Sequence, residues 1–239
     1  MKEVLKLIQE RRSARMPFDS KHPVAKQDLL QILEAGRWAP TAHNMQNFEV
    51  ILVDDENLLK SIADIKRPVS ETFIRENYQQ LSFSEDELLR KKTGLLAAMF
   101  PPAWRNPDFK AADDMEPDPS LQRPFPECPV MLIVVFDPGK RAPDSEGDFL
   151  GILSLGCVME NMWLMASSLG ISFHIVSSLS ADTAENEVKN ILGIPGNLRI
   201  AFSCRLGYTA FSPGKFLRVR RDIRDFTHHN TFGSKGLET

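Results

Sequence analysis

Hydrophobic residues recur with helical spacing near the start of the chain. Val4, Leu7 and Ile8 fall on one face of a predicted helix, which runs into the basic stretch RRSAR. A second predicted helix begins at Ala25 and stops at Pro40, because proline cannot continue the helical hydrogen bonding. The first forty or so residues therefore predict two helices in succession.

Short apolar runs rich in β-forming residues predict strands further along the chain. They cover 48–53, 129–136, 171–176 and 198–208. The first run, FEVILV, is predicted as a buried strand. A helix over 183–192 is predicted between the last two strands. Helices between strands, without a Gly/Ser linker or an internal repeat, indicate one domain of the α/β type.

The most apolar predicted helix covers about 147–168 and is apolar on nearly every face. It must be covered on nearly every face, either by the core of a large domain or by a second subunit. Glu160 and Asn161 argue against a membrane span, and no run approaches the ~20 apolar residues that a span needs. Gly170 is predicted to end the helix in a left-handed conformation.

The segment 66–127 interrupts this pattern. Its first part has helical character, with Ser84 and Glu87 as a candidate capping box. Its second part is dense in proline and acidic residues and has no period. An irregular segment of this length inside a compact chain is usually a functional loop or a mobile one.

Composition narrows the class of protein. The chain has 239 residues and a net charge of −3, which argues against a general nucleic-acid binder. Its N-terminal stretch mixes charged and apolar residues, unlike a signal peptide or an anchor. Cys128, Cys157 and Cys204 lack CxxC spacing, so we expect buried thiols in a reducing compartment. The histidines form no metal-binding pattern, so no metal site is expected, and the cytoplasm is the expected location.

Two basic clusters are candidates for binding an anion. The first, at the end of the first helix, contains Arg11, Arg12, Ser13 and Arg15. The second, in the C-terminal tail, contains Arg218, Arg220, Arg221 and Arg224. Arginine presents planar pairs of donors that match phosphate oxygens. A solvated helix end is the commoner explanation of such a cluster, and the residues alone leave both interpretations open.

A polar loop follows the second helix and contains Pro40, Thr41, Asn44 and Gln46. Its hydroxyl and amide groups suit the edge of a planar heteroaromatic ligand, and loops held by a scaffold often carry function. A turn that satisfies its own backbone is an equally good interpretation. The chain has no GxGxxG, GxxxxGK[ST], HExxH or GxSxG motif, which indicates that a bound cofactor carries the chemistry.

Three segments together resemble the FMN-dependent nitroreductase family: RRSAR, APTAHNMQNFEVILV and LGIPGNLRIAFSCRLGY with the later RVRRDIRDFTHHNTFG. The resemblance covers about 1–60 and 128–232. It implies an α+β fold with a central, mostly antiparallel sheet flanked by helices, in an intertwined homodimer with FMN across the subunit interface. It also implies a single domain over 1–239, with a cover segment at about 66–127 and a C-terminal arm from about 212.

The resemblance assigns cofactor-binding roles to four groups of residues. Arg11, Arg12, Ser13 and Arg15 correspond to residues that bind the FMN phosphate and ribityl chain. Arg218 and Arg220 correspond to residues that also bind the phosphate. The loop that approaches the flavin from the other subunit corresponds to Pro40, Thr41, Ala42, Asn44 and Gln46. The strand end along the isoalloxazine ring corresponds to Ile175, Val176, Ser177 and Ser178, with a serine N–H facing flavin N5. Arg123 corresponds to a residue near the pyrimidine edge of the flavin.

The implied activity is ping-pong hydride transfer from NADH or NADPH through FMN to an electron-poor acceptor such as a nitroaromatic or a quinone. No dedicated catalytic side chain is expected, because the protein positions and polarises the flavin. Two features depart from many relatives: Asn47-Phe48 replaces Pro-Trp, and Ser177-Ser178 stands at the strand end. The alternatives are another flavin reaction, such as reductive dehalogenation or oxidation, a non-enzymatic FMN-binding protein, and a structural dimer that lost its cofactor.

Overall fold

The computed structural model describes residues 2–15, 17–65, 86, 89–90, 127–145, 147–209 and 219–234. The chain divides into two compact units. They comprise Met1–Arg67 with Pro119–Pro213, and Pro68–Asp118 with Gly214–Thr239. Most of the predicted cover segment lies outside the described residues, including both residues of its candidate capping box. The single domain over 1–239 stays a prediction.

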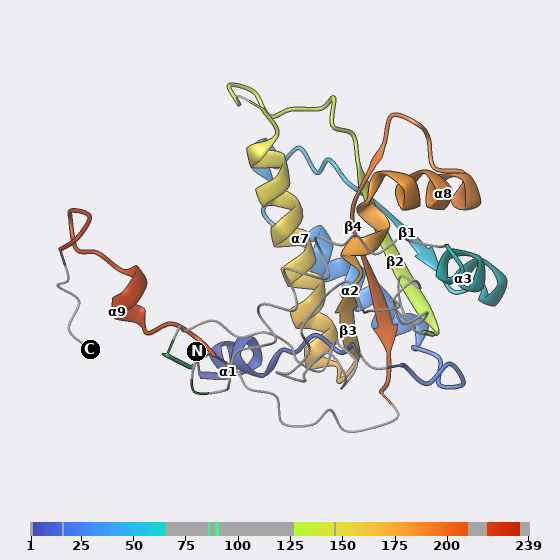
Figure 1. The fold of residues 1–239 in the computed structure, drawn as a ribbon, viewed down its shortest axis with the longest axis horizontal. Coiled ribbons are helices and arrows are strands. Elements are labelled where there is room, and N and C mark those ends of the chain that lie inside the picture. The colour runs from blue at the N-terminus through green and yellow to red at the C-terminus, as the bar shows by residue number, and fades with distance from the viewer. Residues whose placement is uncertain are drawn as a thin grey trace, which may run out of the picture. The chain divides into compact units, whose positions relative to one another are not determined.

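The first unit is built on a four-stranded sheet with the order β1-β2-β4-β3 (Figure 1). Its strands are β1 (Glu49–Val53), β2 (Val130–Phe136), β3 (Ser172–Ile175) and β4 (Arg199–Gly207). Every neighbouring pair is antiparallel, so the predicted antiparallel sheet is confirmed. The α/β interpretation drawn from the order of elements is wrong, because alternating helices and strands do not by themselves fix the direction of the strands.

Helices cover both faces of this sheet, as Figure 1 shows for α7 against α3 and α8. The layers consist of α2 (Lys26–Arg37), α3 (Glu56–Ala63), α7 (Phe149–Ser168) and α8 (Asp182–Leu192). Leu132 and Val134 of β2 point into the core shared with α2 and α7. Met131 and Ile133 point into the core shared with α3 and α8. Because successive side chains of β2 point to opposite faces of the sheet, this strand contributes to two separate cores.

Strand β1 differs from its prediction. It lies at the edge of the sheet, and only Val53 at its end is buried. An edge strand has a neighbour on one side only, so a run of apolar residues there is only partly covered. The central strand β2, by contrast, is buried at every position except Phe136.

Shorter helices complete the described structure: α1 (Lys2–Glu10), η1 (Ala42–Asn44), η5 (Ser177–Ser180) and, in the second unit, α9 (Ile223–Phe226). The long helix α7 ends as predicted, with Gly170 at a φ of 71°. By length and mean hydropathy α7 meets the criterion for a membrane span, contrary to the expectation that no segment would. Core helices of soluble proteins meet the same criterion, and the middle of α7 is packed against α2 through Val158 and Met162.

The three cysteines are free thiols. Cys128 and Cys204 are buried as predicted, whereas Cys157 on α7 is partly exposed. Burial raises the pKa of Cys128 to about 12 and raises the pKa of Cys204 as well. Both buried thiols therefore stay protonated at neutral pH.

Candidate functional site

The predicted arginine cluster lies beside strand β3. Ser13 forms a parallel bridge with Phe173, and the Ala14 amide donates a hydrogen bond to the Phe173 carbonyl at 2.9 Å. The indole Nε1 of Trp163, on α7, donates to the Arg12 carbonyl at 3.3 Å. These contacts hold the backbone of the cluster between β3 and α7, so its side chains project from a fixed frame.

Two arginines of the cluster have different surroundings. The Arg11 Nε lies 3.0 Å from a Glu160 carboxylate oxygen, and its guanidinium lies 4.1 Å from the centre of the Trp163 ring. The Arg15 Nε is buried and donates no hydrogen bond within the described part of the chain. Burial also lowers the pKa of Arg15. A buried guanidinium N–H without an acceptor is costly, so this atom favours a ligand that brings an oxygen.

The polar loop after α2 is held by its own backbone and by α7. The Gln46 amide donates to Oγ1 of Thr41 at 3.2 Å, and the Gln46 side chain donates to Oδ1 of Asn44 at 3.2 Å. The Ala42 amide donates to Oγ of Ser154 at 2.9 Å. Both interpretations of the loop thus keep support, because the turn satisfies part of its own backbone while Asn44 stays exposed.

The same loop contains unusual backbone conformations. His43, Asn44 and Gln46 have φ values of 50°, 52° and 47°. Residues other than glycine adopt this left-handed region rarely, and such strain clusters at functional sites. The loop is therefore a stronger candidate for ligand contact than its sequence indicated.

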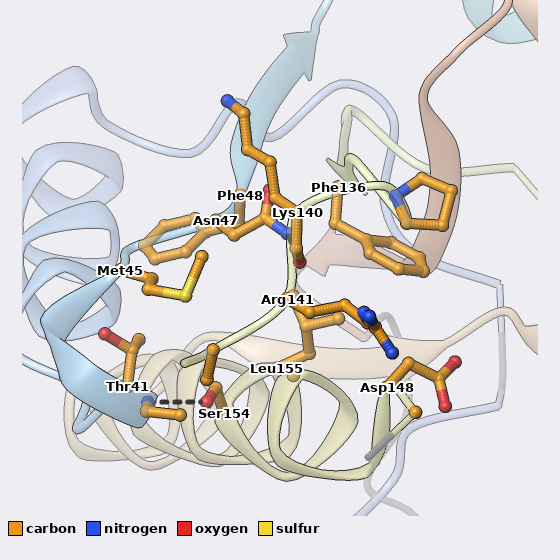
Figure 2. A pocket seen from close by; sticks show the side chains of 15 residues that line it. Thr41, Met45, Asn47, Phe48, Phe136, Lys140, Arg141, Asp148, Ser154 and Leu155 are labelled. Carbon is orange, nitrogen blue, oxygen red and sulfur yellow. Dashed lines mark hydrogen bonds between the residues drawn. The ribbon is translucent and has the colours of Figure 1, made fainter. Parts of the chain in front are cut away.

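Figure 2 shows a hollow between this loop, the turn after β2 and the first turns of α7. Its volume is about 500 Å³, open solvent included. Apolar side chains line much of it, among them Met45, Phe48, Phe136 and Leu155. Thr41 and Ser154 lie at one end, and Arg141 and Asp148 lie toward the other (Figure 2).

Asn47, which lies between the polar loop and β1, supports this hollow. Its Nδ2 donates to the carbonyls of Asp137 at 2.8 Å and Lys140 at 3.2 Å, and its Oδ1 accepts from the Asp137 amide at 3.2 Å. The Asn47 side chain therefore links the turn after β2 to the loop before β1 through hydrogen bonds. Proline could not replace these contacts, because it has no side-chain amide.

The two predicted halves of the site are anchored at different points along α7. Ser154 holds the polar loop and Trp163 holds the arginine cluster, and the two residues are nine positions apart on α7. At a rise of 1.5 Å per residue, their positions on the helix are separated by about 14 Å.

The cluster and strand β3, by contrast, do come together. The predicted strand end is only partly a strand, because β3 stops at Ile175 and Ser177 begins the short helix η5. Val176 links the two, since its amide donates to the Ser203 carbonyl at 2.8 Å and its carbonyl accepts from the Ser203 hydroxyl at 2.8 Å. The turn at Ser177 gives this end a change of direction that an extended strand would lack.

The remaining predicted positions lie elsewhere. Arg220 belongs to the second unit, where its Nη1 donates to the Val219 carbonyl at 2.6 Å. In the same unit Asp222 and Asp225 form a capping box at the start of α9. Arg123 and Arg218 lie outside the described residues.

Sequence reasoning missed a pair beside the cluster, the buried Arg205 on β4 and the partly exposed His174 on β3. The Arg205 Nε lies 3.1 Å from Nδ1 of His174. The signal was available, because a charged residue inside the apolar run IAFSCRLG is unusual. The strand prediction accounts for the apolar residues of this run but not for Arg205.

The model of the Nitroreductase family matches residues 8–208. This span includes the arginine cluster, the polar loop and all four strands. The chain belongs to the nitroreductase family. No curated protein matches it.

Solved structures agree with this membership in the nitroreductase family. A nitroreductase with bound FMN from Bacteroides fragilis is 24% identical, with a TM-score of 0.53, and the match covers 90% of this chain and 95% of that one. A nitroreductase with bound FMN from Desulfitobacterium hafniense is 23% identical, with a TM-score of 0.59 and coverage of 96% and 98%. A protein from Bacteroides thetaiotaomicron, provisionally named an NADH dehydrogenase/NAD(P)H nitroreductase, is 18% identical, with a TM-score of 0.61 and coverage of 96% and 98%. These likenesses show the nitroreductase fold.

Proposed function

We propose that this chain is an FMN-dependent oxidoreductase that uses NADH or NADPH to reduce electron-poor small molecules, such as nitroaromatics or quinones. The observation that carries the proposal is the anchored arginine cluster, with the buried Arg15 Nε donating no hydrogen bond in the described part of the chain. The FMN bound to two of the similar structures supports the choice of cofactor. The name of the Bacteroides thetaiotaomicron protein supports the choice of reductant.

The residues present fit FMN. Arg12, Ser13 and Arg15 would hold its phosphate and ribityl oxygens, since guanidinium forks and a hydroxyl match both groups. Arg11 would contribute from its position between Glu160 and Trp163. When bound, FMN supplies the reversible uptake of a hydride. Residues at the end of β3 would contact the flavin ring, and a backbone N–H of Ser177 or Ser178 would donate a hydrogen bond to it.

We also propose that the working protein is a homodimer with two shared sites. Apolar side chains are exposed on the N-terminal half of α7, where Phe149 is 66% and Leu153 is 51% exposed, and on α1, where Val4 is 61% exposed. Obligate interfaces are rich in such residues. A second chain would also bring a polar loop to each arginine cluster, since within one chain the two segments are anchored about 14 Å apart along α7. We also propose that the protein works in the cytoplasm. The segment 66–127 would cover the site, and the residues from about 212 onward would form a C-terminal arm.

Flavin affinity tests the cofactor assignment. Arg15→Ala should weaken FMN binding by about tenfold or more, because a hydrogen bond to a charged group is worth ~1.5–3 kcal/mol. The matched control is Arg37→Ala, since Arg37 is an exposed arginine that pairs with Glu34 on α2. Fluorescence titration of each apoprotein with FMN measures the affinity. Equal affinities of the Arg15 and Arg37 variants would refute the phosphate role of Arg15.

Anaerobic stopped-flow mixing tests the activity. The flavin absorbance of the FMN-loaded protein should bleach with NADH or NADPH and return with a nitroaromatic or a quinone. Bound flavin that neither nicotinamide reduces would instead identify a non-enzymatic FMN-binding protein. Flavin that is reduced, but re-oxidised only by halogenated compounds, would identify the other flavin reaction.

The assembly is tested by mass in solution. Leu153→Asp should convert a dimer to monomers, because it places a charge in a desolvated interface. Leu58→Asp is the control, since Leu58 is partly exposed on α3 at the opposite face of the sheet. Light scattering after size-exclusion chromatography gives both masses. A monomeric wild type with bound FMN would contradict the shared site.

A further inference from the structure

Trp163 of α7 is buried beside the arginine cluster. Its indole contacts the cluster at two points. The Arg11 guanidinium lies 4.1 Å from the centre of the ring, and Nε1 donates to the Arg12 carbonyl at 3.3 Å. The ring also stacks on Phe173 of β3, with the ring centres 5.2 Å apart and the planes at 17°. The Phe173 carbonyl in turn accepts a hydrogen bond from the Ala14 amide at 2.9 Å. The indole therefore supports the segment from Arg11 to Ala14 both directly and through β3.

The packing of α7 on α2 fixes the position of Trp163. The Asn161 Nδ2, two residues earlier, donates to the Ala35 carbonyl of α2 at 3.1 Å. Met162 lies so close to α2 that a Cβ added at Gly36 would be 3.0 Å from its Cγ. Because packed side chains leave little free space, these two contacts oppose sliding and rotation of α7 against α2. The indole of Trp163 therefore holds a fixed place from which it can position other groups.

The guanidinium of Arg11 is held from two directions. The Trp163 ring contacts it on one side, and its Nε lies 3.0 Å from a Glu160 carboxylate oxygen. One contact with the ring and one at Nε restrict how the guanidinium can turn. Arginine binds phosphate through parallel N–H bonds in the plane of the guanidinium, so the orientation of that plane matters for recognition. Fixing the orientation before a ligand arrives lowers the entropy that binding costs, and this raises the affinity.

We propose that Trp163 is the positioning residue of the flavin-phosphate site, and that it determines a preference for FMN over riboflavin, the same flavin without the phosphate. This inference rests on the proposed function. Trp163 acts through Arg11 and the Arg12 carbonyl, and it needs no contact with the flavin itself. Because the indole is uncharged, it orients the cationic donors without competing with the phosphate for them. A tryptophan that only filled the core would instead affect the binding of both flavins alike.

Binding of FMN and of riboflavin to the flavin-free, full-length protein tests the inference. Trp163→Leu removes the ring and its N–H, whereas Trp163→Phe keeps a smaller ring without the N–H. Trp38→Leu is the matched control, because the exposed Trp38 at the end of α2 makes contacts of the same kinds. Its Nε1 donates to Glu34 at 2.7 Å, and the Arg37 guanidinium lies 5.6 Å from its ring centre. Fluorescence titration measures each affinity, and circular dichroism shows whether each variant is folded.

We expect the wild type to bind FMN at least about a hundredfold more tightly than riboflavin, because each of two hydrogen bonds to a charged phosphate contributes about tenfold or more. Trp163→Leu should reduce this ratio of affinities about tenfold, and Trp163→Phe about threefold. The reduction should come from weaker FMN binding, with the riboflavin affinity changed by less than about threefold. Trp38→Leu should keep both affinities within about twofold of the wild type.

A folded Trp163→Leu that keeps the wild-type ratio, whether or not both affinities fall, would overturn the proposal. An equal loss of the ratio in Trp38→Leu would overturn it as well. Should Trp163→Leu fail to fold, Trp163→Phe decides, and an unchanged ratio in that variant overturns the proposal. A wild type that binds neither flavin would refute the proposed function itself. That outcome is distinct from the others, in which the wild type binds FMN and only the variants depart from expectation.

Discussion

His174 makes the stability of the protein depend on pH in a predictable direction. Burial, followed by the charges of Arg205 and Arg15, lowers its pKa in the folded chain to about 3, against about 6.5 for an unperturbed histidine. Between these values the unfolded chain binds a proton at this residue and the folded chain does not. The free energy of unfolding therefore falls as the pH is lowered from about 6.5 toward about 3, and is fully retained above that window.

The perturbation that isolates this effect is His174→Gln. Glutamine does not titrate, and its side-chain oxygen can accept from Arg205 as Nδ1 does. A difference of one bound proton changes the free energy of unfolding by ~1.4 kcal/mol per pH unit. Between pH ~5.5 and ~4.5, the stability of the wild type relative to the variant should fall by about that amount.

Urea unfolding of both proteins at several pH values measures the difference. Carboxylates elsewhere titrate in the same range, but they do so in both proteins and cancel in the comparison. A wild-type-minus-variant difference that stays constant from about pH 7 to about pH 4 would show that His174 is protonated in the folded chain as readily as in the unfolded one. The assignment of His174 as a neutral imidazole, with Nε2 as its single donor, would then be wrong.

Further predictions concern packing and hydrogen bonding in the first unit. Gly207→Ala should destabilise the fold by about 1–3 kcal/mol, because a Cβ there would lie 2.8 Å from Cδ of Pro129 and 3.0 Å from the Phe18 side chain. Gly196→Ala, with nothing within 4 Å, is its control, and equal urea midpoints for the two variants would contradict the close approach. Asn47→Ala should cost about 1–3 kcal/mol, because two backbone carbonyls and one amide lose their partner. An unchanged unfolding free energy would mean that Asn47 does not hold the turn after β2.

Much of the fold was predictable because helices and their ends follow from local sequence patterns. The helical spacing of Val4, Leu7 and Ile8 and the breaks at Pro40 and Gly170 each act within a few residues, and each prediction agrees with the structure. Strand direction and burial did not follow in the same way. They depend on which strands become neighbours, and FEVILV reads as buried although it forms an edge.

In the candidate site, too, the residue types were predictable from the sequence and their arrangement in space was not. The Arg11–Arg15 segment and the polar loop were found from their residue types, but their separation along α7 is a tertiary fact that no local pattern contains. Arg205 and His174 lie 31 positions apart and meet only because β3 pairs with β4 in a particular register. Registers of this kind are set by the whole sheet, so the sequence marks Arg205 as an unusual residue in an apolar run but does not show that it meets His174.

The central claim is that the arginine cluster holds FMN, and the visible absorption spectrum of the freshly purified protein tests it most directly. The account predicts a yellow protein with flavin absorbance bands, and release of about one FMN per chain on denaturation. A colourless protein that also takes up no added FMN would contradict the account, and Arg11, Arg12 and Arg15 would then be no more than the charged end of a helix.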